Sequence, residues 1–262
     1  MIIDFHTHYY PDDLAYRALH GVDDVCEGDN DGTYRGLKKA MQKAGVDRAV
    51  VLAVCNRPEH EDKINSFILG CADEAIIPFF SVHPYSENAP ELVRKYAGLG
   101  VKGIKLHPNM QQFRLGDERF PPFCRAIRET GIIALFHCGK PGRTPTSFDV
   151  YPSDFLPLMD ILDPERTVLA HTGGYGVSDS ELDVLRAMNV YTDLSLASSQ
   201  FTPDRMKSIL ESIPADRLLF GSDAPWRDIS ASLDFIRASC RDDTALQLLL
   251  HINAEKLLGL NG

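Results

Sequence analysis

Short runs of valine, isoleucine, leucine and phenylalanine recur along the chain, separated by longer segments with helical periodicity. Nearly continuous apolar runs of this kind are typical of strands that are buried on both faces. The pattern predicts eight strands, which we place at Ile2–His8, Arg48–Val54, Ile76–His83, Val101–His107, Ile132–His137, Thr167–His171, Val190–Leu194 and Leu218–Asp223.

The segments between these runs predict helices, and glycines at positions 45 and 100 are typical helix stops. The acidic stretch Asp23–Asp31 is too polar for a core, and we expect it to be a mobile loop. The expected helices are Thr33–Ala44, Pro58–Glu74, Ala89–Leu99, Phe120–Thr130, Asp154–Leu162, Asp179–Met188, Pro203–Ser212, Ala231–Cys240 and Thr244–Leu258.

Regular alternation of strand and helix requires a parallel sheet. Eight such units in 262 residues favour a closed (β/α)8 TIM barrel, and no break in composition divides the chain. We therefore expect residues 1–262 to form a single α/β domain. No Gly-x-Gly-x-x-Gly sequence follows a strand, so the open dinucleotide-binding sheet lacks its signature.

Composition narrows the class of partner. A net charge of −10 argues against nucleic acid or an acidic membrane surface, so we expect a small-molecule substrate. No apolar stretch is long enough to span a membrane, and no secretory signal is recognisable at the N-terminus. The six cysteines are scattered without a Cys-x-x-Cys pair, as expected for reduced thiols in a cytoplasmic enzyme.

Strands 1, 4, 5, 6 and 8 of the predicted barrel end in the ionisable side chains that we expect to form a site. Function in such barrels lies at the carboxyl ends of the strands, so these side chains should share one rim. Crowding them there is unfavourable unless a metal ion or hydrogen bonds satisfy them, and imidazole is a common metal ligand. The sequence therefore predicts a metal centre among His6, His8, Lys105, His107, His137, His171 and Asp223.

The same strand ends carry motifs of a known family. These are Asp4-Phe-His-Thr-His8, Gly103-Ile-Lys-Leu-His-Pro108, Leu135-Phe-His-Cys-Gly139, Leu169-Ala-His-Thr-Gly173 and Leu219-Phe-Gly-Ser-Asp-Ala-Pro225. With them the chain resembles, essentially from end to end, the amidohydrolase superfamily in its amidohydrolase 2 branch.

The resemblance implies a ligand set. His6, His8, His137 and Asp223 would hold a divalent metal, with Zn²⁺ the expected ion. His171 would be a ligand in two-metal relatives and would act on the water or the substrate in one-metal relatives. In two-metal relatives a carbamylated lysine, here Lys105, would bridge the ions; we favour one metal, with Lys105 and His107 binding substrate.

The resemblance also leaves several activities open. The expected reaction is hydrolysis of a C–N or C–O bond by a metal-activated water, with Asp223 and His171 as catalytic residues. The alternative is a metal-dependent decarboxylase of a small carboxylate. A TatD-like nuclease is less favoured because it would carry a glutamate on strand 4, and a non-enzymatic barrel would have lost some of these ligands. Many relatives are dimers, which implies a homodimer here.

Basic and aromatic residues near the same rim suggest an anionic substrate. Arg57 follows strand 2, Arg143 follows strand 5, and Trp226, the only tryptophan, lies just past Asp223. Arginine pairs well with carboxylates, and an indole ring can form a cavity wall. We therefore expect Arg57, Arg143 and Trp226 to bind substrate.

Overall fold

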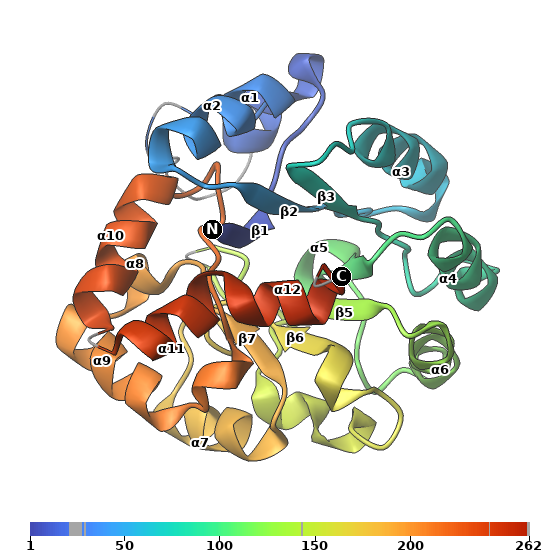
Figure 1. Cartoon of the computed structure of the whole chain (residues 1–262). Helices are drawn as coiled ribbons and strands as arrows, with labels where there is room; N and C mark the ends of the chain where they lie inside the picture. Colours follow the sequence, from blue (N-terminus) through green and yellow to red (C-terminus); the bar gives the residue numbers. More distant parts are fainter. Residues whose placement is uncertain (21–27, 29, 143, 241, 261–262) are drawn as a thin grey trace.

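A computed structural model describes residues 1–20, 28, 30–142, 144–240 and 242–260. In this part of the chain eight parallel strands form a TIM barrel with helices around it, as predicted (Figure 1). The strands lie within the predicted ranges but are shorter: β1 (Ile3–Thr7), β2 (Arg48–Leu52), β3 (Ile76–Phe79), β4 (Gly103–Leu106), β5 (Ile133–Phe136), β6 (Thr167–Leu169), β7 (Tyr191–Asp193) and β8 (Leu218–Leu219).

Regular pairing divides the barrel wall into two sheets, β1-β2-β3 and β4-β5-β6-β7-β8. Single parallel bridges join them, Phe80 with Ile104 on one side and Thr7 with Ala224 on the other. Backbone hydrogen bonds continue across the second junction, where Phe5 N donates to the carbonyl of Phe220 over 2.8 Å. The barrel is therefore closed, although β8 itself is only two residues long.

Helices cover the outside of the barrel. Thr33 caps α2 by accepting a hydrogen bond from Gly36 N, and Gly45 ends it with φ of 71°. The α-helices are α1 (Asp12–His20), α2 (Tyr34–Ala44), α3 (Glu61–Gly70), α4 (Ala89–Gly98), α5 (Pro108–Gln111), α6 (Phe120–Thr130), α7 (Asp179–Met188), α8 (Ala197–Gln200), α9 (Pro203–Ser212), α10 (Ile229–Ser239), α11 (Asp243–Gln247) and α12 (Asn253–Leu258).

Some helices differ from the sequence prediction. The segment expected as a helix over Asp154–Leu162 is a 3₁₀ helix at Pro152–Leu158, because Pro157 lacks the N–H that an α-helix needs. A π-helical turn at Leu248–Ile252 interrupts the expected C-terminal helix. Helices α1, α5 and α8 were not predicted. Most of the expected mobile loop Asp23–Asp31 lies outside the described residues.

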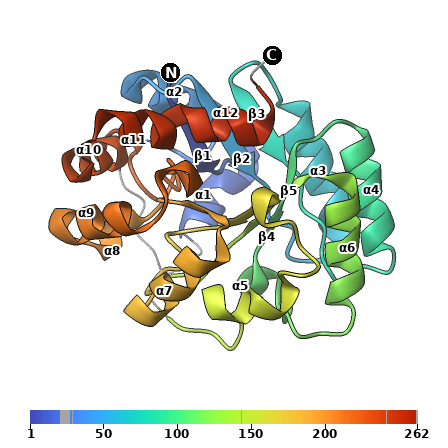
Figure 2. The ribbon, with the colours of Figure 1, turned by 60° about the horizontal axis from the view of Figure 1, so that its bottom comes forward.

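The C-terminal helix α12 closes the amino-terminal end of the barrel. Its side chains Ala254, Leu257 and Leu258 pack with strand residues such as Ile3 and Ile133 in a cluster inside the barrel. Figure 2 shows α12 and α5 at opposite ends of the molecule. Because α5 follows β4 directly, the carboxyl ends of the strands face the end that α12 leaves open.

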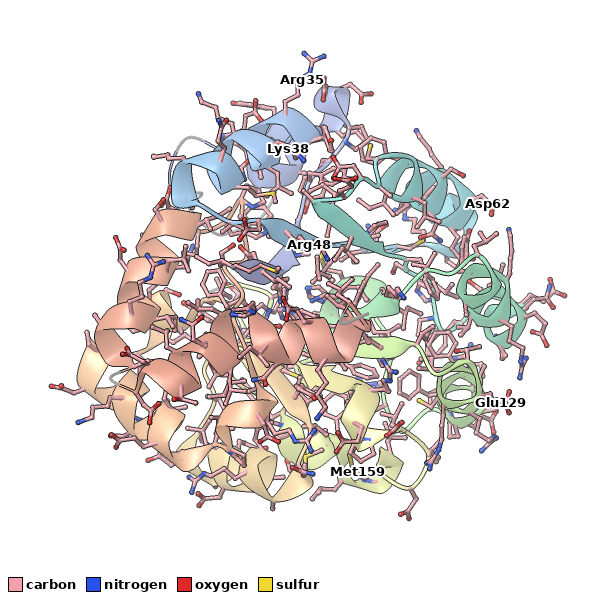
Figure 3. The ribbon with its side chains drawn as sticks, viewed as in Figure 1. Arg35, Lys38, Arg48, Asp62, Glu129 and Met159 are labelled. Atoms are coloured by element: carbon pink, nitrogen blue, oxygen red, sulfur yellow. The ribbon has the colours of Figure 1, made fainter. Side chains whose placement is uncertain are left out.

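Charged side chains lie mainly on the outer helices. Arg35 and Asp62 project outward from α2 and α3, and Glu129 projects from α6 (Figure 3). A second apolar cluster packs between these helices and the outer face of the strands. No helix in the described ranges has both the length and the hydropathy needed to cross a membrane.

Candidate metal centre and active site

A cavity of about 170 Å³ opens at the carboxyl-terminal end of the barrel. Eight of the ten residues that the sequence singled out line it, and they come from strands far apart in the sequence. The eight are His6, His8, Lys105, His107, His137, His171, Asp223 and Trp226.

Two imidazoles of β1 and a carboxylate after β8 meet at the floor of this cavity. His6 Nε2 lies 3.3 Å and His8 Nε2 lies 3.2 Å from Asp223 Oδ1. The pairing of β1 with β2 shifts register between Asp4 and Thr7. Side chains at the end of β1 therefore do not simply alternate between the two faces of the strand. Both imidazoles nevertheless reach the same carboxylate, and the three donor atoms lie within 4.8 Å of one another.

The other nitrogen of each imidazole determines what this cluster can bind. His6 Nδ1 donates to Asp193 Oδ2 over 2.9 Å, and His8 Nδ1 donates to the carbonyl of Leu52 over 2.9 Å. In a neutral imidazole the opposite nitrogen, Nε2, then carries a lone pair. Two lone pairs and a carboxylate oxygen therefore converge, an arrangement that a divalent cation satisfies. The donor set fits a metal ion.

Charge and burial maintain these protonation states. Burial, with a smaller effect of Lys105, lowers the pKa of His6, which keeps its imidazole neutral. Burial alone would raise the pKa of Asp223, but the neighbouring imidazoles of His6 and His8 hold it well below its usual range. Asp223 is therefore a carboxylate, as a metal ligand must be.

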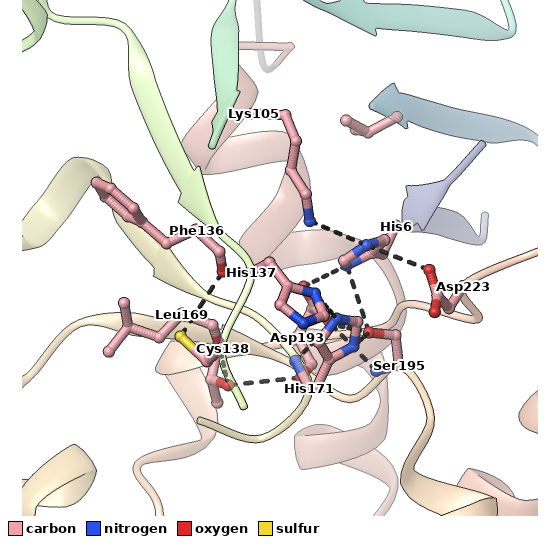
Figure 4. Close-up of polar contacts among 12 residues, drawn as sticks. His6, Lys105, Phe136, His137, Cys138, Leu169, His171, Asp193, Ser195 and Asp223 are labelled. Carbon is pink, nitrogen blue, oxygen red and sulfur yellow. Dashed lines mark hydrogen bonds and ion pairs between the residues drawn. The ribbon is translucent and has the colours of Figure 1, made fainter. Parts of the chain in front are cut away.

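Two residues that the sequence analysis did not single out support the imidazoles. Asp193, the last residue of β7, accepts hydrogen bonds from His6 Nδ1, His171 N and the hydroxyl of Ser195. The Ser195 hydroxyl in turn lies 2.7 Å from His171 Nδ1 (Figure 4). The rule that chemistry lies at strand ends would have identified Asp193 had it been applied to strand 7.

His171 and His137 form a second contact pair beside the first cluster. His171 Nε2 lies 2.9 Å from His137 Nδ1, while His137 Nε2 lies 3.2 Å from the carbonyl of Lys140. Burial lowers the pKa of His171 to about 3. His137 is not part of the converging donor set described above, and the metal-ligand role expected for it stays a prediction.

His107 presents a hydrogen-bond donor to the cavity. Its ring stacks on that of His137 with centroids 3.8 Å apart. His107 is also the N-cap of α5, where its Nδ1 accepts a hydrogen bond from Met110 N. Because Nδ1 accepts this hydrogen bond, the proton of the neutral ring lies on Nε2. The Nε2–H group can therefore donate a hydrogen bond to an anionic substrate.

Lys105 is fully buried in β4 and points toward β1 (Figure 4). Its Nζ lies 3.2 Å from His6 Nε2. Burial lowers the pKa of Lys105 to about 8, while the carboxylates of Asp193 and Asp223 oppose that shift. The carboxylates therefore offset part, but not all, of the effect of burying the Lys105 charge.

Strained backbone holds two of the functional side chains. His171 has φ of 60° and Asp223 has φ of 69°, in the left-handed region that disfavours residues with a Cβ. The Asp223 N–H donates to the carbonyl of His6 over 2.8 Å, which fixes the backbone beside the cluster. Such strain persists where surrounding contacts over-determine a functional geometry.

Of the two arginines expected to bind substrate, Arg57 is described and is not among the residues that line the cavity. Arg57 is exposed at the start of a short 3₁₀ helix, so its expected role gains no support from its position. Arg143 lies outside the described residues. Trp226 lines the cavity as expected, and Lys140, from the same loop as Arg143, lines it as well.

Asp4 positions the turn that carries Asp223. It is fully buried and accepts hydrogen bonds from Ser222 N over 2.9 Å and from Ser222 Oγ over 2.6 Å. Burial raises the pKa of Asp4 from 3.8 to about 7, although the bonds from Ser222 lower it. The folded protein therefore binds the carboxyl proton of Asp4 more tightly than the unfolded chain does.

We expect Asp4 to make stability fall as pH rises. Between pH 3.8 and about 7 the folded state keeps a proton on Asp4 that the unfolded state has lost. Its stabilising contribution is therefore complete below pH 3.8 and is lost as pH rises through about 7. In urea unfolding of metal-free protein, stability relative to Asp4→Asn should fall on the order of 2 kcal/mol from pH 5 to 8. A difference independent of pH would contradict the shift.

Comparison with known proteins agrees with this geometry. A sequence model of the amidohydrolase family matches residues 3–260. The chain belongs to the amidohydrolase family. A search of curated proteins finds no match. The expected resemblance is thus confirmed, and the amidohydrolase match covers nearly the whole barrel.

Solved structures share this amidohydrolase's fold at low sequence identity. The 5-carboxyvanillate decarboxylase of Sphingomonas paucimobilis has a TM-score of 0.72 at 12% identity, covering 98% of each chain. A dihydroxybenzoic acid decarboxylase of Polaromonas sp. JS666, with bound manganese and 2-nitroresorcinol, has a TM-score of 0.73 at 16% identity, covering 100% of this chain and 97% of that one. A probable 2-pyrone-4,6-dicarboxylic acid hydrolase of Acinetobacter baumannii, with citric acid bound, has a TM-score of 0.67 at 15% identity, covering 98% and 99%.

Proposed function

We propose that this amidohydrolase is a metal-dependent decarboxylase of a small carboxylate. The observation that carries the proposal is the convergence of His6 Nε2, His8 Nε2 and Asp223 Oδ1 on the floor of a largely apolar cavity. Most of the structurally similar proteins with a named activity are decarboxylases, which supports this reaction over the hydrolysis first expected. Their named substrates are small carboxylates.

The cavity suits a carboxylate that leaves as carbon dioxide. Val54, Met110, Leu196 and Trp226 form apolar walls. Loss of carbon dioxide disperses the charge of the carboxylate, so a site that excludes water favours the transition state over the charged reactant. A cavity of about 170 Å³ is small, and a cavity of roughly 150 Å³ holds a benzene-sized ligand. We therefore propose a compact, single-ring carboxylate as substrate.

We assign the metal to His6, His8 and Asp223, with His137 as a further ligand. When bound, a divalent metal supplies a Lewis acid that polarises substrate oxygen atoms. The set formed by His6, His171 and Asp193 also has converging donors. There, however, His6 uses the nitrogen that already donates to Asp193, so we propose one metal rather than two. Zinc remains the expected ion; manganese is the ion of one structurally similar protein.

The remaining polar side chains would bind the substrate and transfer a proton. His107 Nε2–H and the Lys105 ammonium face a carboxylate placed in the cavity. Decarboxylation breaks the bond between the carboxylate and its carbon, releases carbon dioxide and needs one proton at that carbon. We assign that proton transfer to Asp223 and His171, whose side chains border the cavity and whose positions the Asp193–Ser195 pair maintains.

Hydrolysis is the second candidate, because one observation favours it. Asp223 is held as a carboxylate, the form that accepts a proton from water, and one structurally similar protein is a probable hydrolase. The two reactions differ in what they consume. Hydrolysis inserts the oxygen of a water molecule into the product, whereas decarboxylation inserts only a proton.

Isotope labelling distinguishes the two reactions. The metal-loaded protein is incubated in ¹⁸O water with a panel of small mono- and dicarboxylates, including hydroxylated benzoates and a pyrone dicarboxylate. Our proposal predicts release of carbon dioxide and an organic product without ¹⁸O. A product that contains ¹⁸O, formed without carbon dioxide, would identify a hydrolase and refute the decarboxylase.

A further inference from the structure

Among the described residues that line the cavity, Lys140 is a cation without an ion pair. Lys140, in the loop after β5, lines the cavity and is half-buried. In the described part of the chain no ion pair includes Lys140. For Lys105, by contrast, the carboxylates of Asp193 and Asp223 offset part of the effect of burial on its pKa. Partial burial of an unpaired charge is unfavourable, and an anionic ligand removes that cost.

The backbone of Lys140 is fixed on both sides. Its N–H donates to the carbonyl of Tyr175 over 3.3 Å, beside the bridge between Gly139 and Tyr175. Its carbonyl lies 3.2 Å from His137 Nε2. The position of the Lys140 Cα is therefore coupled to an imidazole of the site, and its side chain starts from a defined point.

The side chain of Lys140 lies across Gly176. A Cβ at position 176 would sit 3.2 Å from Lys140 Cε and 3.5 Å from Nζ, and Gly176 has φ of 84°. The positive φ favours glycine at position 176, and the end of the lysine side chain lies within contact distance of this turn. The end of the Lys140 side chain therefore lies beside Gly176, which follows Tyr175 in the cavity lining.

Hydrogen bonds connect the loop that carries Lys140 to α5, the helix that follows the neighbouring strand β4. Asn109, in α5, donates through Nδ2 to Asp149 Oδ1 over 2.7 Å, to Thr146 Oγ1 over 3.0 Å and to the carbonyl of Gly139 over 3.4 Å. Asp149 Oδ1 also accepts from Thr146 N and Oγ1. Both ends of the loop from 139 to 149 are therefore anchored to the element that follows His107.

We propose that Lys140 is a specificity-determining residue that binds a second anionic group of the substrate, a carboxylate remote from the one that reacts. The inference rests on the proposed function in taking the substrate to be a small carboxylate, and it narrows the class to dicarboxylates. The metal ligands, with Lys105 and His107, bind one end of the molecule, and Lys140 binds the other. An ammonium that pairs with a carboxylate away from bulk water contributes a charge-assisted hydrogen bond.

Direct binding tests this assignment without turnover. Calorimetry on the metal-loaded protein compares isophthalate with benzoate, and glutarate with butyrate, so that each pair differs by one carboxylate. The wild type should bind the dianion about tenfold or more tightly in at least one pair, as a charge-assisted hydrogen bond predicts. Lys140→Met should abolish that preference and leave the monoanion unaffected, whereas Lys140→Arg should retain it.

A matched control and two outcomes decide the result. Lys102→Met removes an exposed lysine just before β4 and should change neither affinity. A wild type without preference in either pair would overturn the proposal, as would a Lys140→Met variant that keeps the preference. If carbon dioxide release fails but the preference and its loss in Lys140→Met are observed, the decarboxylase is wrong and the dicarboxylate site stands.

Discussion

Asp223→Asn is expected to retain much of the bound metal and to lose nearly all turnover. The imidazoles of His6 and His8 stay in place, since their Nδ1 atoms are held by Asp193 and by the carbonyl of Leu52. The amide can no longer accept or deliver the proton that the reaction moves. General acid–base groups contribute about 10²–10⁴-fold, so kcat should fall within that range. Metal content by elemental analysis and kcat are measured together, on the substrate identified by the labelling experiment.

The control for this variant is Asp234→Asn, which changes an exposed carboxylate on α10. It should match the wild type in both measurements. Normal turnover in Asp223→Asn would exclude Asp223 from proton transfer. Complete loss of metal together with activity would instead show that Asp223 acts mainly as a ligand.

Asp193→Asn should weaken metal binding although Asp193 need not touch the metal. Its carboxylate accepts the Nδ1 proton of His6, which directs the His6 Nε2 lone pair to the cluster. Replacing a carboxylate behind a ligating histidine typically lowers metal affinity by about 10–100-fold. Competition with a chelating dye measures the affinity. Excess metal should restore much of the activity, because the ligands themselves are intact.

Asp183→Asn, on the exposed face of α7, is the matched control and should bind metal as the wild type does. Unchanged affinity in Asp193→Asn would show that the contact with His6 does not orient the ligand. Lost activity that excess metal does not restore would assign Asp193 a positioning role beyond metal binding, through Ser195 and His171.

The sequence predicted the barrel because its signals are local and repeated. Eight apolar runs, each followed by a helical segment, allow few other folds. The strand ends then indicated which side chains would meet. Strand limits were overestimated because residues such as His107 and His137 lie just past the last paired residue, where the chain already turns toward the cavity.

The supporting residues were harder to predict, since their roles depend on distances across the barrel. Asp193 is one carboxylate among 37 acidic residues, and only its contact with His6 distinguishes it. The cations that face a substrate are hard to predict for a similar reason. Arg57 follows a strand yet is exposed, whereas Lys140 lines the cavity. Which loop residues line the cavity depends on the tertiary structure and cannot be deduced from their position after a strand.

The weak junction between β1 and β8 gives the metal ligands a second role, which is to hold the two strands together. One bridge, with a few backbone hydrogen bonds, is all the pairing that joins these strands in the described structure. His6 and His8 stand on one side of this seam and Asp223 on the other. An ion bound by all three residues would cross-link the end of β1 to the segment after β8. Chelation should therefore speed amide exchange first at the edges of β1 and β8, before the rest of the wall opens.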